Sequence, residues 1–114
     1  MVKPSKLLLY SAIVINLLIL GGCKAGEGFY KKIDEINHSV EQSDWKQTRE
    51  GAEKLSNMYK DGKWKLQLLG DEAEYEGINV ELEKLKEATN AKDKTQVKVS
   101  LGTIRAHLRD IYSF

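Results

Sequence analysis

Cysteine and proline are almost absent from this sequence. Cys23 is the only cysteine, so the chain forms no internal disulfide and no metal site built from several cysteines. Pro4 is the only proline and lies close to the N-terminus. The rest of the chain therefore lacks the residue that most often breaks a helix, which suits long uninterrupted helices.

An excess of charge of one sign is also lacking. The chain has 18 basic and 17 acidic residues. Lys3 and Lys6 belong to the leader described below, and the remaining 16 basic and 17 acidic residues leave a balance of −1. Nucleic-acid binding usually needs a clustered positive face, and adsorption to anionic lipid needs an excess of positive charge. We expect no nucleic-acid partner and no membrane binding by charge alone.

The N-terminus has the composition of an export signal. Lys3 and Lys6 precede an apolar run from Leu7 to Leu20, which only two polar residues interrupt. The run of about 14 residues is shorter than the roughly 20 residues of a spanning helix and fits the apolar core of a signal peptide. We predict that residues 1–22 are a lipoprotein signal peptide.

Cys23 directly follows Leu20, Gly21 and Gly22, and these four residues resemble the lipobox of bacterial lipoproteins. The small residues fit the signal peptidase, and the cysteine thiol accepts diacylglycerol. Two acyl chains anchor a protein stably, because each buried CH2 contributes about 0.8 kcal/mol. We therefore predict lipidation at Cys23 and a mature protein at the outer face of the bacterial cytoplasmic membrane. An uncleaved single-pass signal anchor is the alternative and places the domain on the same side; a cytoplasmic protein is a third interpretation.

Helical periodicity fills the rest of the chain. Residues 23–28 contain two glycines and are expected to be a flexible spacer. From residue 29 onward, apolar or small side chains recur at steps of three and four, the pattern of amphipathic helices. Four stripes follow one another: Phe29, Ile33, Ile36 and Val40; Trp45, Thr48, Ala52, Leu55, Tyr59, Gly62, Leu66 and Leu69; Tyr75, Ile78, Leu82, Leu85 and Thr89; Val97, Leu101, Ile104, Leu108 and Ile111. Because the connections are short, we predict an all-α helical domain over residues 29–114, a four-helix antiparallel bundle of helical hairpins with a long second helix.

The breaks between the stripes contain capping residues. Ser43 or Asp44 is suited to cap the second helix and Asp93 the fourth. Asp71 is suited to cap the third helix, with Glu74 placed for a capping box. Each break therefore marks the start of a new helix.

The second stripe keeps its phase across Asp61 and Gly62, although this pair is also a turn signal. We predict one continuous or kinked helix of roughly 38 Å, with a break at this pair as the alternative. The step of three and four also fits coiled-coil packing, so a homodimer along this helix is a further alternative.

Residues typical of catalysis or metal binding are few. Neither His38 nor His107 has a second histidine three or four residues away, as a helical metal site usually needs. The sequence shows no Ser-His-Asp or Cys-His arrangement and no phosphate-binding glycine loop. The many glutamates between residues 72 and 87 alternate with lysines opposite the apolar stripe, as on a solvated helix face. We predict that the protein is not an enzyme and uses no cofactor or metal.

The tripeptide Lys63-Trp64-Lys65 is unusual, because Trp64 falls off the apolar stripe. One interpretation is a contact site for a partner, a lipid headgroup or a cell-wall glycan. The other, which we favour, is that Trp64 packs on the edge of a neighbouring helix while the lysines reach solvent. Trp45 lies on the stripe beside a cap and is expected in the core.

Several short motifs carry a resemblance beyond the leader. Ser43-Asp44-Trp45 opens the long helix, Lys63-Trp64-Lys65 follows, and Ala91-Lys92-Asp93-Lys94 joins the last two helices. In these features the chain resembles a bacterial family known as domain of unknown function 4363, over most of residues 27–112, and departs from it at Asp61-Gly62. The resemblance implies a membrane-tethered helical domain and brings no known activity, substrate or cofactor.

The predicted function is therefore that of a membrane-tethered lipoprotein whose helical domain is a non-catalytic interaction module. Its expected partner is an envelope protein or a cell-wall polymer. One alternative is a small-ligand or metal sensor that uses His38 or His107, which requires the two histidines to approach each other. Another is a self-associating structural spacer built on the long second helix.

Overall fold

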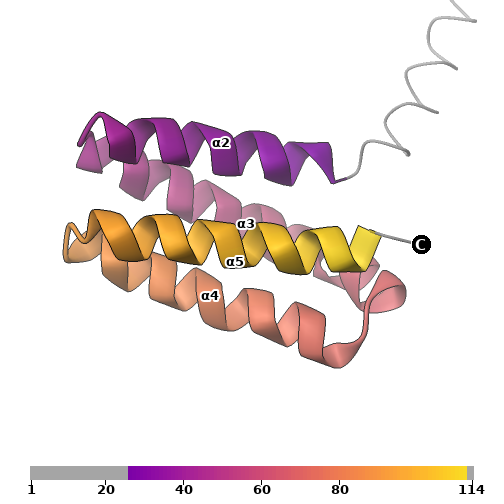
Figure 1. Ribbon diagram of the computed structural model, residues 1–114. Helices are drawn as coiled ribbons and strands as arrows, with labels where there is room; N and C mark the ends of the chain where they lie inside the picture. Colours follow the sequence, from indigo (N-terminus) through magenta and orange to yellow (C-terminus); the bar gives the residue numbers. More distant parts are fainter. Residues whose placement is uncertain (1–25, 113–114) are drawn as a thin grey trace, which may run out of the picture.

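The computed structural model describes residues 26–112, and within this range the chain is all helical. The helix bounds are α2 Glu27–Glu41, α3 Trp45–Leu69, α4 Glu72–Asn90 and α5 Lys94–Tyr112 (Figure 1). The predicted all-α fold with four helices and a long second helix is confirmed. The predicted signal peptide and Cys23 lie outside the described residues.

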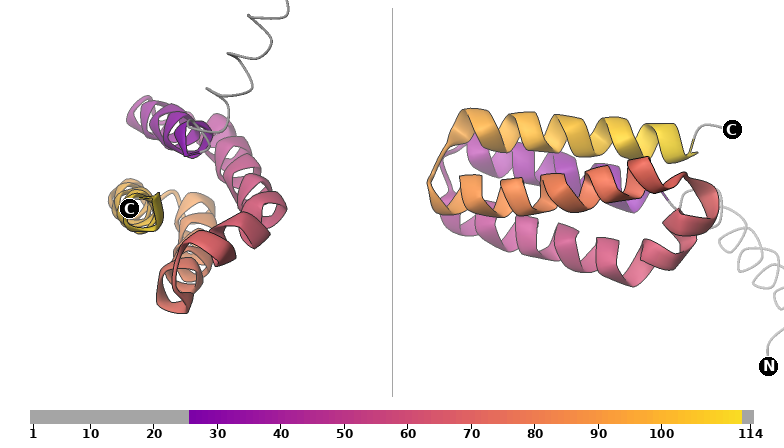
Figure 2. Two further views of the ribbon diagram at one scale, coloured as in Figure 1. Left: turned by 90° about the vertical axis from the view of Figure 1, so that its right-hand side faces the viewer. Right: turned by 90° about the horizontal axis from the view of Figure 1, so that it is seen from below.

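The four helices form a closed ring of antiparallel neighbours. Each of α2 and α4 packs against both α3 and α5, and the contact between α4 and α5 is the most extensive (Figure 2). Over residues 26–112, α2 and α4 lie diagonally opposite and do not touch. Short connections that reverse the chain direction produce this arrangement.

The core is made by the predicted stripes, because each stripe turns one apolar face of its helix inward. Among residues 26–112 the buried hydrophobic side chains are Phe29, Ile33, Ile36, Val40, Ala52, Leu55, Tyr59, Leu66, Ile78, Leu82, Leu85, Ala88, Val97, Leu101, Ile104, Leu108 and Ile111. Trp45 is partly buried and packs against this core, as expected. The buried hydroxyls of Thr48 and Thr89 donate to the carbonyl oxygens of Asp44 and Leu85, each at 2.8 Å, so they cost little to bury.

The helix starts follow the predicted caps. A side-chain oxygen of Asp44, Asp71 and Asp93 accepts a bond of 3.1 Å from the backbone N–H three residues later. Asp44 and not Ser43 caps α3, and Ser43 takes a left-handed conformation with a φ of 54° in the turn before it. Residues 27 and 28, which were expected in the flexible spacer, already belong to α2.

The long helix α3 continues through Asp61 and Gly62, as predicted. It bends in its C-terminal part (Figure 2), and glycine is a common residue at helix bends. A β-carbon built on Gly62 would lie 3.8 Å from Phe29 Cζ, so Gly62 is level with the start of α2. The last turns of α3 run past α2, and Leu69 is therefore exposed and not in the core, contrary to prediction.

Candidate functional site

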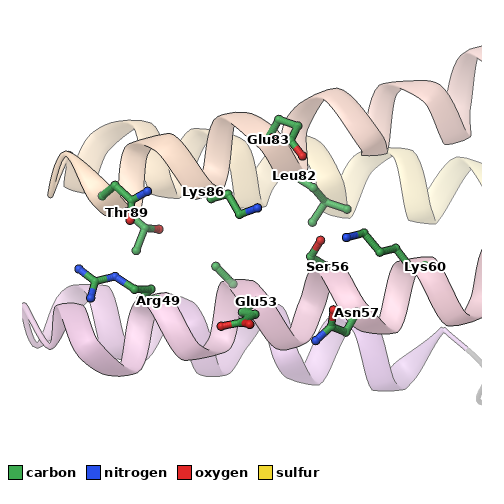
Figure 3. A pocket seen from close by; sticks show the side chains of 11 residues that line it. Arg49, Glu53, Ser56, Asn57, Lys60, Leu82, Glu83, Lys86 and Thr89 are labelled. Atoms are coloured by element: carbon green, nitrogen blue, oxygen red, sulfur yellow. The ribbon is translucent and has the colours of Figure 1, made fainter.

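A groove of about 300 Å3 lies between α3 and α4, in the half of the bundle near the α4–α5 connection (Figure 3). Its floor consists of Ala52, Leu82 and Thr89, which are all buried side chains at the base of the groove. The Thr89 hydroxyl already donates its hydrogen to the carbonyl oxygen of Leu85. The floor therefore offers a ligand mainly apolar surface.

The rim of this groove is charged. Arg49, Glu53 and Lys60 come from α3, and Glu83 and Lys86 come from α4 (Figure 3). Within residues 26–112, no two of these five side chains form an ion pair with each other, and all five are exposed. Exposed charges of this kind cost little to rearrange, so the rim can pair with charges of either sign on a ligand.

A second arrangement joins α4 to α5. The Nδ1 atom of His107 lies 2.8 Å from Oε2 of Glu74, and the two side chains are 27% and 26% exposed. The predicted capping box forms only in part, because Asp71 accepts from the Glu74 backbone N–H while the Glu74 carboxylate contacts His107.

His38 and His107 do not come together. Ion pairs of Asp34 with Arg105 and of Glu41 with Lys98 show the antiparallel register of α2 and α5. This register separates the levels of the two histidines by about six residues, or roughly 9 Å along the axis. The part of the chain from 26 to 112 contains no group of three or more His, Cys, Asp or Glu that could hold a metal ion. The two histidines therefore do not come as close to each other as a sensor built on both of them would require.

The end of α3 carries an exposed apolar cluster, which we call the α3 tip and which consists of Trp64, Leu68 and Leu69. These side chains are 59%, 78% and 43% exposed. The expectation that Trp64 packs on a neighbouring helix is wrong, because Trp64 lies off the stripe that α3 turns toward the core and its side chain stays exposed. Lys63 is half-buried, and Lys65 Nζ lies 5.4 Å from the centroid of the Trp64 ring, within the range of a cation–π contact.

The sequence matches the model of a protein family. The domain of unknown function DUF4363 matches residues 24–113. The chain belongs to this family. No curated protein and no solved structure matches it.

Only some of the predicted site residues of this DUF4363 protein lie within the described part of the chain. Trp64 belongs to the α3 tip, and Lys63 and Lys65 flank it on α3. Leu20, Gly21, Gly22 and Cys23 lie outside residues 26–112, so lipidation at Cys23 stays a prediction. None of the four described helices is both long enough and apolar enough to cross a membrane.

Sequence reasoning missed both the groove and two members of the α3 tip. Leu68, like Trp64, falls off the apolar stripe, and that displacement was the available signal. The groove depends on the spacing between α3 and α4, which periodicity along one helix does not report.

Proposed function

We propose that this protein is a membrane-tethered lipoprotein whose helical domain is a non-catalytic interaction module. Its docking site is the groove between α3 and α4, and its partner is a helical segment of an envelope protein. The observation that carries the proposal is the apolar floor of the groove beneath a rim with charges of both signs.

The shape of the groove favours a helix as the occupant. Its α3 wall extends from Arg49 to Lys60, which is about three helical turns. Amphipathic helices commonly bind in apolar grooves between two helices, with their own charges at the rim. No aromatic side chain lines this groove, whereas a glycan would need flat apolar surfaces for its sugar rings. A helical segment of a protein therefore fits better than a wall polymer.

The lining residues also support a non-catalytic role. They include neither histidine nor cysteine, the residues most often used as general base or nucleophile. The serine at the groove, Ser56, has no histidine beside it in the lining that would activate its hydroxyl. Binding is what these side chains are suited to.

The membrane tether is supported by the leader and by where the family match begins. The match starts at residue 24, directly after Cys23. The apolar run of the leader is thus outside the family domain, as expected of a segment that serves export and anchoring. A tethered domain reaches partners in the same envelope layer at a high effective concentration, which favours docking even at modest affinity.

A photo-crosslinking amino acid at Asn57 in living cells tests the groove. Asn57 lines the groove and is exposed, so the substitution leaves the core unchanged. We expect a discrete crosslinked protein. The substitution Lys86→Glu at the rim is expected to lower the yield of this crosslink. Thr95, which is exposed on α5 and is not among the residues that line the groove, is the matched control position. The same adducts from both positions, or none from Asn57, would contradict docking in the groove.

The mass of the protein extracted from membranes tests the tether. We expect residues 23–114 plus a diacylglyceryl group, and loss of both the cleavage and the lipid in Cys23→Ala. If both proteins had the mass of the full-length chain without lipid, the lipoprotein interpretation would be wrong and the signal-anchor interpretation would take its place.

A further inference from the structure

The α3 tip lies at the end of the bundle where the described chain begins. A β-carbon on Gly26 would lie 3.0 Å from Cδ2 of Tyr112, so the start of α2 meets the end of α5. A β-carbon on Gly70 would lie 2.7 Å from Cγ1 of Ile111, so the α3–α4 connection is at this end too. Figures 1 and 2 show the three features together at one end of the ring of helices.

We infer that the α3 tip inserts into the surface of the lipid bilayer that holds the protein. The inference rests on the tether in the proposed function. Cys23 is only three residues before Gly26, and three extended residues span roughly 10 Å at most. A lipid on Cys23 therefore holds this end of the bundle, and not the end with the α4–α5 connection, against the membrane.

The position of the tip on α3 brings it toward this membrane. Gly62 is level with Phe29 near the start of α2, so residues 63–69 extend past the first turn of α2. These residues contain Trp64 and Leu68, two of the most exposed large hydrophobic side chains of residues 26–112. An apolar patch that extends past the first turn of α2 at the anchored end therefore lies close to the bilayer surface.

The side chains of the tip match the chemistry of the membrane interface. Tryptophan prefers the headgroup level, and leucine contributes favourable free energy when it enters the acyl region. Lys63 and Lys65 flank Trp64, and lysine keeps its ammonium group in water while its carbon chain lies along apolar surface. A tip with this composition lies in the interface plane and does not span the bilayer.

Charge does not drive this contact. Asp71, Glu72 and Glu76 are exposed in the first turns of α4, next to the α3–α4 connection. Their negative charges offset those of Lys63 and Lys65. The insertion is therefore apolar, and it occurs in zwitterionic vesicles and persists at high salt, where electrostatic attraction is screened.

Quenching of Trp64 fluorescence by brominated lipid tests the inference. The protein extracted from membranes, with Trp45→Phe so that Trp64 is the only tryptophan, is reconstituted into phosphatidylcholine vesicles. We expect a roughly twofold loss of emission when the bromines are near the top of the acyl chains, the depth that interfacial helices reach. Bromines near the bilayer midplane quench less.

A tryptophan at Val99 is the matched control. The chain then carries Trp45→Phe, Trp64→Phe and Val99→Trp. Val99 is 53% exposed, close to the 59% of Trp64, but lies 13 residues before Tyr112 on α5. This is roughly 20 Å from the anchored end, beyond the reach of acyl-chain bromines. We expect no loss of emission from this position.

The outcomes separate the tip from the tether. The protein could float with the vesicles while Trp64 is unquenched, or while Trp64 and the Val99→Trp control are quenched equally. Either result overturns the insertion of the tip and leaves the proposed function in place. A chain that does not float overturns the tether and the insertion together. Leu68→Glu alters an exposed side chain and is expected to restore most of the Trp64 emission without loss of helical structure.

Discussion

The imidazole ring of His107 occupies the space that a side chain at position 77 would need. A β-carbon built on Gly77 would lie 2.6 Å from both Cε1 and Nε2 of that ring. From this position His107 reaches Oε2 of Glu74, one turn earlier on α4. The most extensive helix contact of the domain thus depends locally on a residue without a side chain.

Gly77→Ala is expected to destabilise the protein by about 1–3 kcal/mol, although alanine is the better helix former. The new methyl group forces the His107 ring away from α4 and from the Glu74 carboxylate. Urea denaturation followed by circular dichroism measures the change in the free energy of unfolding.

His107→Ala provides the control for this prediction. It removes the ring atoms that lie nearest to the new β-carbon, so Gly77→Ala in that background is expected to stabilise the helix by up to about 1 kcal/mol. An equal cost of Gly77→Ala in both backgrounds would show that the ring is not the cause.

Gly62→Ala is expected to have the opposite effect to Gly77→Ala. The new β-carbon would lie 3.8 Å from Phe29 Cζ, an ordinary contact, and Gly62 has no positive φ. Alanine then stabilises α3 by about 0.5–1 kcal/mol through its helix propensity. Urea denaturation measures this gain, and a loss of stability would indicate that the chain leaves the helix at Asp61 and Gly62.

Periodicity in the sequence predicted the parts of the fold that depend on one helix at a time. The stripes identified the core, and the positions of Asp71 and Asp93 identified helix starts, because both signals are local. The contact between Glu74 and His107 joins residues 33 positions apart, and it depends on how α4 and α5 are rotated against each other. Leu69 continues the apolar stripe of α3, and the sequence pattern therefore predicted that it is buried. It lies where α3 extends past the start of α2, so its side chain is exposed.

Leu66 and Leu68 offer a comparison within a single turn of α3. Leu66 is 1% exposed, so Leu66→Ala is expected to cost about 2–5 kcal/mol of folding free energy. Leu68 projects into solvent, and Leu68→Ala is expected to change stability by less than about 0.5 kcal/mol. Thermal or urea denaturation of the two variants checks the difference. Similar costs for both would contradict the orientation of the last turns of α3.

Tyr59 is expected to make stability depend on pH in alkaline solution. Its hydroxyl is buried and donates a 2.7 Å hydrogen bond to the carbonyl oxygen of Tyr75. Burial raises the pKa of Tyr59, and the nearby Glu76 carboxylate adds to the increase. The folded protein therefore keeps this proton at a pH where the unfolded chain, with a tyrosine pKa of about 10, has begun to release it.

The contribution of the protonated Tyr59 hydroxyl to the free energy of unfolding is fully present below about pH 10. It is lost as the pH rises through the pKa that Tyr59 has in the folded protein. Tyr59→Phe is expected to cost about 1 kcal/mol at neutral pH, through loss of the hydrogen bond. It should also flatten the decline in stability above pH 10. Burial raises the pKa of Tyr112 as well, so part of the decline remains. Urea denaturation of both proteins from pH 7 to about 11 measures the two slopes. Identical slopes would mean that the Tyr59 hydroxyl ionises as freely in the folded protein as in the unfolded chain.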